Sequence, residues 1–430
     1  MLLYLQVLYI LTVFLFTFFI KLSVGQPVKD LLMVALFGLL FITYHRTVLG
    51  FLNRHMSVVA LFAVFAIVGA LVTILSGRPA ADLVNSFLRI IVQPFLILSC
   101  TYVLTRLSGV RFTAGVFIGM ALLTSAFAVL QFAGIEPAWA IKEAIARIQN
   151  EPRNLQDIIE AQGRPMGLSL TPIVFSYHIA SAYVIASLLY RFGYLRGGLY
   201  LVLALVLLVA AVANGTRSLV IGIILYELLH NFMKLSLRSL ISCAAIVVVA
   251  VIGYFYLEGS GSRVASLNDA SAMGRFVLYE YGLRLAGDHP LGFGWDFKPY
   301  ENAWLYWEHL SDSAKSMSIF HLKIHNAFIN FFLTYGVLGL VAVGFAFYIN
   351  PKRFMLIVTT FTVYFVHSAF HNDGVFLGEN YFWYAFAVLL FVCDEREGVR
   401  DRMPVPVGPA TGAVAAGVRA SARPPRRSRR

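Results

Sequence analysis

The chain has 430 residues, of which 59% are hydrophobic and only 13% are charged, and its mean hydropathy is +0.76. Soluble globular domains carry about 25% charged residues, so this composition excludes an ordinary soluble protein. The formal net charge of +12 fits nucleic-acid binding only if the basic residues share one surface, so their placement decides its meaning. The three cysteines, Cys100, Cys243 and Cys393, lie far apart, which predicts neither a disulfide framework nor a CxxC metal site.

Apolar runs of about 17 to 23 residues recur along the chain, and this length crosses roughly 30 Å of hydrocarbon at 1.5 Å per residue. About twelve such runs predict an all-α polytopic membrane protein. They lie near residues 2–20, 31–44, 57–76, 83–104, 112–132, 171–190, 199–213, 218–233, 240–257, 327–350, 354–370 and 381–393. The first run has no basic n-region and no small-residue cleavage site, so it is expected to be a membrane anchor rather than a cleaved signal peptide.

The connections between the runs predict the orientation, because short cytoplasmic loops are enriched in Lys and Arg. Each even-numbered connection carries two bases and no acid: Arg46 and Arg54, Arg106 and Arg111, Arg191 and Arg196, Lys234 and Arg238, Lys352 and Arg353. In the odd-numbered connections the bases are offset by acids such as Asp30 and Asp373. We therefore expect both termini in the cytoplasm. The positive charge is an orientation signal, and no nucleic-acid partner is expected.

Two connections exceed turn length, and both are expected on the outer side of the membrane. The first, residues 134–170, has apolar residues at helical spacing from Trp139 to Ile148, which predicts an interfacial amphipathic helix. The second, residues 258–326, is the largest polar segment. Residues 1–393 would then form a transmembrane catalytic domain, followed by a disordered basic cytoplasmic tail at 394–430 with nine arginines.

Five polar sites gather at the predicted outer ends of the helices, and together they favour an anion-binding site. Arg89 is expected about 10 Å below the outer surface, counting seven residues at about 1.5 Å each. The other sites are Arg164, Arg217, Arg275 and the pair His325-Asn326. An arginine presents a fixed fork of donors that suits phosphate or diphosphate. For each arginine taken alone, snorkelling or an ion pair with a loop acid is an equal alternative.

His325 is the candidate for proton transfer, because an imidazole titrates near neutral pH and can accept a proton from a sugar hydroxyl. The alternative is a helix-capping or interfacial histidine. His321 and His325 stand four residues apart, but no further ligands accompany them, so no metal site is predicted. Trp295 and the aromatic residues after it fit either stacking on sugar rings or a belt at the membrane interface.

Several motifs in order along the chain resemble the O-antigen ligase and Wzy-type polysaccharide polymerase superfamily. The early motifs are Gly163-Arg164-Pro165-Met166-Gly167 and Thr216-Arg217-Ser218, and the later ones are Gly274-Arg275-Phe276-Val277-Leu278-Tyr279, His289-Pro290-Leu291-Gly292-Phe293-Gly294, His325-Asn326-Ala327-Phe328 and Tyr335-Gly336-Val337-Leu338-Gly339-Leu340. The resemblance is strongest over residues 263–347.

This resemblance implies a metal-independent glycosyltransferase of the GT-C type that needs no cofactor. It implies transfer of a glycan from undecaprenyl diphosphate to an acceptor sugar hydroxyl at the periplasmic face. His325 would be the base, and Arg217 and Arg275 would hold the diphosphate, with Arg164 and Arg89 as further candidates. The implied partners are the lipid-linked glycan, an acceptor glycan or lipid A core, membrane lipids and other polysaccharide assembly proteins.

Three functions remain open from the sequence. The favoured one is a polymerase that joins repeat units of an exopolysaccharide, capsule or O-antigen. The first alternative is an O-antigen ligase that transfers the finished chain to lipid A core. The second is of another class, a twelve-helix transporter or a flippase for the lipid-linked glycan. Carriers usually have matched halves, whereas here the largest loop interrupts an asymmetric chain.

Overall fold

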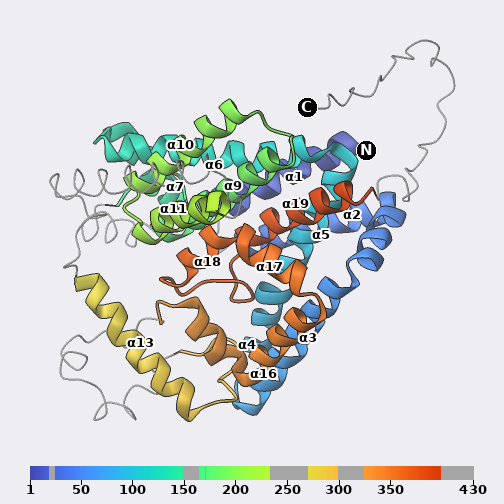
Figure 1. Cartoon of the computed structure of the whole chain (residues 1–430), viewed down its shortest axis with the longest axis vertical. Coiled ribbons are helices and arrows are strands. Elements are labelled where there is room, and N and C mark those ends of the chain that lie inside the picture. The colour runs from blue at the N-terminus through green and yellow to red at the C-terminus, as the bar shows by residue number, and fades with distance from the viewer. Residues whose placement is uncertain (19–24, 149–163, 170, 233–269, 299–323, 399–430) are drawn as a thin grey trace.

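A computed structural model of the protein describes residues 1–18, 25–148, 164–169, 171–232, 270–298 and 324–398 (Figure 1). Within these ranges the chain forms helices and turns and no β-strand, so the prediction of an all-α protein is confirmed there. The helices are α1 (Leu2–Phe18), α2 (Gly25–Arg54), α3 (Met56–Leu75), α4 (Ala80–Phe87), the π-helical turn η1 (Leu88–Val92), α5 (Gln93–Ser108), α6 (Val110–Phe132), α7 (Glu136–Ile148), α9 (Pro172–Arg191), α10 (Gly197–Ala213), α11 (Arg217–Phe232), α13 (Ala270–Asp288), α16 (Ala327–Ile349), α17 (Pro351–Thr360), α18 (Thr362–Ser368) and α19 (Tyr381–Arg396).

Six described helical stretches are long and apolar enough to cross a membrane: Val28–Arg54, Met56–Leu75, Leu83–Ser108, Val110–Phe132, Pro172–Arg191 and Ala327–Ile349. Two shorter apolar helices, Leu2–Thr17 and Gly197–Ala213, accompany them. The predicted count of twelve spans stays a prediction, because the span predicted at residues 240–257 lies outside the described residues. The part of the predicted tail from residue 399 onward also lies outside them. Helix α19 continues to Arg396, so the first three residues of the predicted tail, 394–396, are helical.

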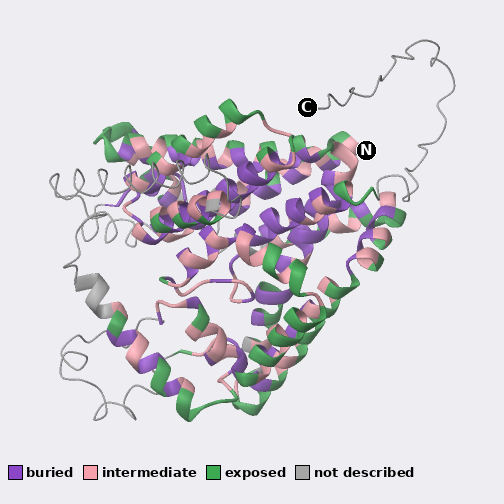
Figure 2. Cartoon of the chain, in the orientation of Figure 1, coloured by how far each residue is buried: buried purple, intermediate pink, exposed green. Residues whose placement is uncertain are grey.

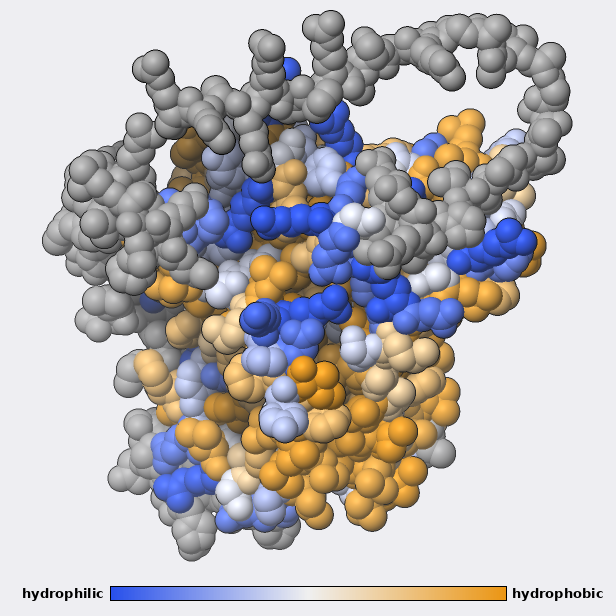
Figure 3. All heavy atoms as spheres, turned by 45° about the vertical axis from the view of Figure 1, so that its right-hand side comes forward, coloured by the Kyte–Doolittle hydropathy of each residue, from blue (hydrophilic) through white to orange (hydrophobic). Residues whose placement is uncertain are grey.

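The protein exposes a broad apolar surface that suits lipid. Figure 3 shows hydrophobic side chains over the side of the molecule on which α3 and α16 lie. Ile67 of α3 is 67% exposed and Val341 of α16 is 62% exposed. Water would penalise so much contiguous apolar area, whereas helices, whose backbone groups pair internally, can face hydrocarbon.

The centre of the fold is made by α9 and α19, which are buried along most of their length (Figure 2). Helix α19 packs against α5 and α9, and its aromatic side chains interlock with those of α3 and the 369–380 loop. Its first turn is capped by the Glu379 carboxylate, which accepts hydrogen bonds from the backbone N–H groups of Tyr381 and Phe382 at 2.6 and 3.0 Å.

The span predicted at residues 354–370 differs in the structure, because it is two short helices. Helices α17 and α18 are separated at Phe361, whose backbone leaves helical geometry at φ −99° and ψ 20°. The Phe361 ring is fully buried and packs against Phe382 and Phe386 of α19. Apolar content alone does not register such a break, since both halves remain hydrophobic.

Helix α16 is broken at Gly336, where φ is +60° and ψ is −158°. The break leaves the carbonyls of Leu333 and Thr334 without helical partners, and the loop after α13 supplies them. The N–H groups of Phe293 and Gly294 donate to these carbonyls at 2.6 and 3.2 Å. The residue after the break, Val337, donates in return to the Pro290 carbonyl at 2.8 Å. The loop is therefore built into the helix.

This loop places Trp295 in the core, so neither sugar stacking nor an interfacial belt describes it. Trp295 is 1% exposed and lies against Gly69 of α3. Its indole N–H donates to the Tyr335 hydroxyl at 3.1 Å, and its backbone N–H donates to Thr73 Oγ1 at 2.8 Å. A large ring with a paired N–H is a stable core residue, and here it fastens the loop to α3.

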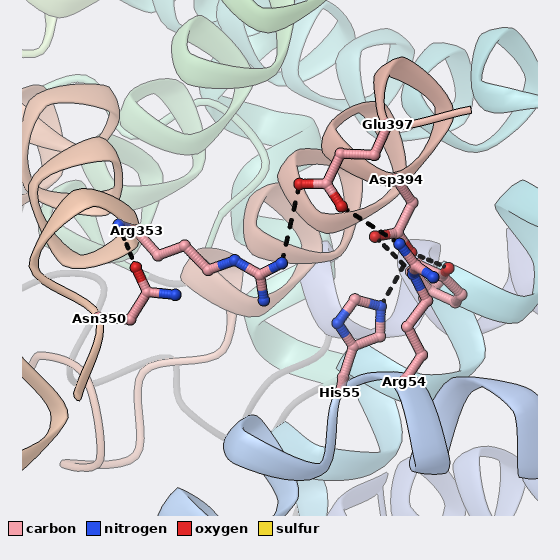
Figure 4. A network of polar contacts seen from close by, with 7 residues as sticks. Arg54, His55, Asn350, Arg353, Asp394 and Glu397 are labelled. Atoms are coloured by element: carbon pink, nitrogen blue, oxygen red, sulfur yellow. Dashed lines mark hydrogen bonds and ion pairs between the residues drawn. The ribbon is translucent and has the colours of Figure 1, made fainter. Parts of the chain in front are cut away.

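A polar network joins the α2–α3 junction to α17 and α19 (Figure 4). The Asp394 carboxylate pairs with Arg54 Nε at 2.8 Å and with His55 Nε2 at 3.1 Å. Glu397 pairs more loosely with Arg54 and Arg353, at 3.3 and 3.7 Å. Arg54 and Arg353 belong to two even-numbered connections, so the network brings together two loops predicted to be cytoplasmic.

Replacing Asp394 by Asn is expected to lower the free energy of unfolding by about 3 kcal/mol, because removing one partner strands buried charges. Asp394 is 4% exposed and accepts from Arg54, His55 and Tyr102. Thermal unfolding in detergent, followed by tryptophan fluorescence, measures the loss. The control is Glu397→Gln, whose 51% exposed side chain should contribute less than about 1 kcal/mol. Equal melting temperatures for both variants would contradict this account.

Candidate functional site

Arg164 is fastened to the segment that leads into α11. It is 8% exposed, its Nε donates to the Asn214 carbonyl at 3.1 Å, and its Nη2 donates to Thr216 Oγ1 at 2.7 Å. Arg217 and Ser218 follow directly as the first residues of α11. Two motifs separated by about fifty residues in the sequence therefore meet at the N-terminal end of one helix, where the helix dipole favours anions.

The segment that carries Arg164 is held by α6. The Gln131 side-chain oxygen accepts from the backbone N–H groups of Met166 and Gly167 at 3.0 and 2.9 Å. Gly167 has φ +59°, and a Cβ there would lie 2.2 Å from the Thr124 carbonyl oxygen. A glycine is needed for this close approach. Gly167, the last residue of the Gly163–Gly167 motif, therefore packs its backbone directly on α6. The predicted helix between these segments is present as α7.

His325 lies in a short segment whose backbone is fixed on both sides. The Tyr279 hydroxyl of α13 donates to the His325 carbonyl at 2.8 Å. The next residue, Asn326, caps α16 by accepting from two backbone N–H groups of its first turn at 2.9 and 3.1 Å. Asn330 Nδ2 donates to the Ile324 carbonyl at 2.6 Å. The half-buried His325 side chain is thus presented by a rigid turn.

The charges of four side chains act on one buried histidine, His371. The pKa of His371, in the loop between α18 and α19, is held well below its usual value, first by burial and then by the charges of His367, Arg275, Arg164 and His325. Arg164, Arg275 and His325 come from three separate motifs and three separate elements. The structure therefore brings these three predicted residues together.

Arg217 is next in the chain to Ser218, whose side chain contacts His367 and His371. Ser218 Oγ lies 3.0 Å from His367 Nδ1 and 3.4 Å from His371 Nε2. Since Arg217 and Ser218 form the first turn of α11, the start of this helix reaches the histidine pair. Three of the five predicted sites, Arg164, Arg275 and His325, thus share this neighbourhood, and a fourth, Arg217, adjoins it in the chain through Ser218.

Arg89 stands in a different setting from the other arginines. It lies within the π-helical turn η1, where its Nη2 pairs with the Asp296 carboxylate at 3.0 Å. Ser86 also bonds Asp296, and the backbone of Gly378 lies beside the Arg89 side chain. The ion pair with a loop acid, one of the two sequence interpretations, describes what Arg89 does in the structure.

The sequence analysis gives no functional role to His367, His371 or Ser176, and it includes Ser218 only as part of the Thr216-Arg217-Ser218 motif. His367 and His371 stand four residues apart, but α18 ends at Ser368, so helical spacing would not have predicted their contact. The hydrogen bonds from the serines of α9 and α11 depend on tertiary packing. His321 lies outside the described residues. Within the described ranges no group of three or more His, Cys, Asp or Glu side chains is placed to hold a metal ion.

Replacing Arg164 by Lys is expected to lower the melting temperature of the protein, because one ammonium cannot reproduce a guanidinium fork. Each lost charge-assisted hydrogen bond, to Asn214 and to Thr216, contributes about 1.5–3 kcal/mol. Thermal unfolding in detergent measures the effect. The matched control is Arg147→Lys. The Arg147 side chain is 70% exposed and pairs with Glu143 at the surface, so this replacement should change the melting temperature little. Wild-type behaviour of Arg164→Lys would rule out this anchoring role.

The fold and the cluster define a polytopic membrane protein with arginines and histidines gathered at helix ends. A family model described as O-Antigen ligase matches residues 177–344, which include Arg217, Arg275 and His325. This region of the chain therefore matches the O-antigen ligase family, which supports the resemblance predicted from the motifs. The match fits a ligase or polymerase-type enzyme of polysaccharide assembly, and together with the apolar helices it fits a multi-pass inner-membrane protein. None of the curated proteins matches the chain.

Proposed function

We propose that the protein is a glycosyltransferase that moves a glycan from undecaprenyl diphosphate to a sugar hydroxyl at the periplasmic face. We propose further that it joins repeat units of a surface polysaccharide. The observation that carries the proposal is the shared neighbourhood of Arg164, Arg275 and His325. Their motifs are far apart in the sequence, so their convergence indicates a common task.

The chemistry follows from the donor. A lipid diphosphate is already an activated leaving group, so transfer needs positive charge beside the departing oxygen, an oriented acceptor and a base. Arg164, Arg217 and Arg275 supply the charge in this proposal, and the N-terminal end of α11 adds its dipole. His325 takes the proton of the acceptor hydroxyl as the new glycosidic bond forms and the bond to the diphosphate breaks.

A ligase reaction is the second candidate, because the matching family model carries that description. The donor and the leaving group are the same in both reactions, and only the acceptor differs. A site that binds the diphosphate and activates a hydroxyl therefore serves either reaction. A transporter or flippase would need neither a base nor an acceptor.

The test is a reconstituted transfer assay. Purified protein in lipid vesicles receives a synthetic undecaprenyl-diphosphate repeat unit, and the products are separated by length on a gel. A ladder of products supports a polymerase, and one transfer to an added acceptor supports a ligase. The control donor is the same glycan on undecaprenyl monophosphate, which lacks the good leaving group. Absence of transfer together with movement of donor across the vesicle would refute the enzyme proposal.

A further inference from the structure

Beside the proposed diphosphate site lies a buried chain of two serines and two histidines that the proposed reaction does not use. Ser176 Oγ lies 2.8 Å from His367 Nε2, and Ser218 Oγ lies 3.0 Å from His367 Nδ1 and 3.4 Å from His371 Nε2. The two rings are in contact, with centroids 4.2 Å apart. All four side chains are at most 5% exposed.

The direction of these hydrogen bonds follows from one hydroxyl proton. The Ser176 hydroxyl donates to the Ile173 carbonyl at 2.7 Å, so Ser176 must accept from His367 Nε2. A neutral His367 then has its lone pair on Nδ1, which accepts from Ser218. Ser218 in turn accepts from His371 Nε2, which leaves the basic lone pair of His371 on Nδ1.

The Nδ1 atom of His371 is therefore the basic end of the chain. Among the described residues it has no hydrogen-bond partner, although His371 is only 1% exposed. A buried polar atom without a hydrogen-bond partner lowers the stability of the folded protein. Such an atom therefore points to a role in function.

Burial first, and then the surrounding charges, hold the pKa of His371 low and keep it neutral in the empty site. The guanidinium groups of Arg275 on α13 and of Arg164 in the segment before α9 face it, together with the imidazole of His325 in the turn before α16. His367 of α18 lies against it, and the ring of Tyr177 on α9 is 6.2 Å away. An anion beside the two arginines would cancel the repulsion that opposes a proton on His371.

We propose that His371 takes up one proton from solvent at Nδ1 when a diphosphate binds beside Arg164 and Arg275. The inference rests on the proposed function, because it uses the same diphosphate site. The protonated imidazole adds a positive charge when the leaving group needs it. His371 releases this proton when the diphosphate leaves, so the empty site does not hold a third positive charge beside Arg164 and Arg275.

Proton uptake on binding can be measured directly by calorimetry. Inorganic pyrophosphate is titrated into the purified protein at one pH in two buffers of different ionisation enthalpy, which gives the number of protons exchanged. The wild-type protein is expected to take up about one proton more per pyrophosphate than His371→Gln. Its affinity should rise more steeply as the pH falls, by up to about tenfold per pH unit. Pyrophosphate's own titration is common to both proteins and cancels.

Three further variants make the outcome decisive. His371→Asn repeats the test if the glutamine variant does not fold, and His230→Gln, near the other end of α11, should leave proton uptake at the wild-type value. Equal uptake in wild type and His371→Gln would overturn the inference. Loss of uptake in His325→Gln instead would also overturn it and assign the proton to His325. Absence of pyrophosphate binding would remove the proposed diphosphate site as well, whereas binding with unchanged uptake removes only the role of His371.

Discussion

Replacing His325 by Ala is expected to reduce glycan transfer by a factor of about 10²–10⁴, the usual contribution of a general base. The reason is that no proton acceptor then faces the sugar hydroxyl. The surrounding structure should survive, because the bond from Tyr279 reaches the backbone carbonyl of residue 325, and Asn326 rather than His325 caps α16. Initial rates in the reconstituted assay, with equal amounts of inserted protein, measure the effect.

The control for this variant is His45→Ala. His45 is exposed on α2, so its loss should leave the rate within about twofold of wild type. Circular dichroism and melting temperature should be the same for both variants and the wild type. A His325→Ala protein that retains more than half of its activity would show that another group takes the acceptor proton, and the base assignment would be withdrawn.

Replacing Gly336 by Ala is expected to prevent accumulation of folded protein. At φ +60° and ψ −158° a residue with a side chain is strained by about 1–3 kcal/mol. A Cβ at this position would also lie 2.2 Å from the Leu291 carbonyl carbon, and backbone atoms cannot rotate away. Relief requires the 289–298 loop to withdraw, which breaks its hydrogen bonds to α16 and frees Trp295 from the core.

Gly344 provides the matched control within the same helix. It is exposed, and a Cβ there would meet no atom within 4 Å. Gly344→Ala should change stability by no more than about 1 kcal/mol, in the favourable direction, because alanine is the better helix former. Size-exclusion profiles and melting temperatures of both variants decide the matter. A well-folded Gly336→Ala protein that melts within a few degrees of wild type would contradict the role given to the break.

Local signals in the sequence predicted much of the helical framework. Hydrophobic run length located α3, α6, α9 and α16 to within a few residues, because lipid contact demands apolar composition over the whole span. Periodic apolar residues from Trp139 to Ile148 predicted α7. The motif argument selected Arg164, Arg275 and His325, which the fold places in one neighbourhood.

What the sequence did not predict depends on contacts between distant segments. The positive φ of Gly336 becomes necessary only because residues 290–294 enter the break in α16. Arg89 was grouped with the other arginines by its expected depth, but depth does not report position around the bundle, and Asp296 provides its partner. His371 follows α18 without continuing it, so no periodic pattern marks it.

The position of α19 at the centre of the bundle has a consequence for biogenesis. The Tyr381 hydroxyl donates to the Phe16 carbonyl of α1 at 3.1 Å, and Asp394 joins the junction of α2 and α3. Most of the chain therefore leaves the ribosome before the helix that fills its centre exists. The earlier helices are therefore made before α19, and the packing of α5 and α9 against α19 is completed only after α19 has been made.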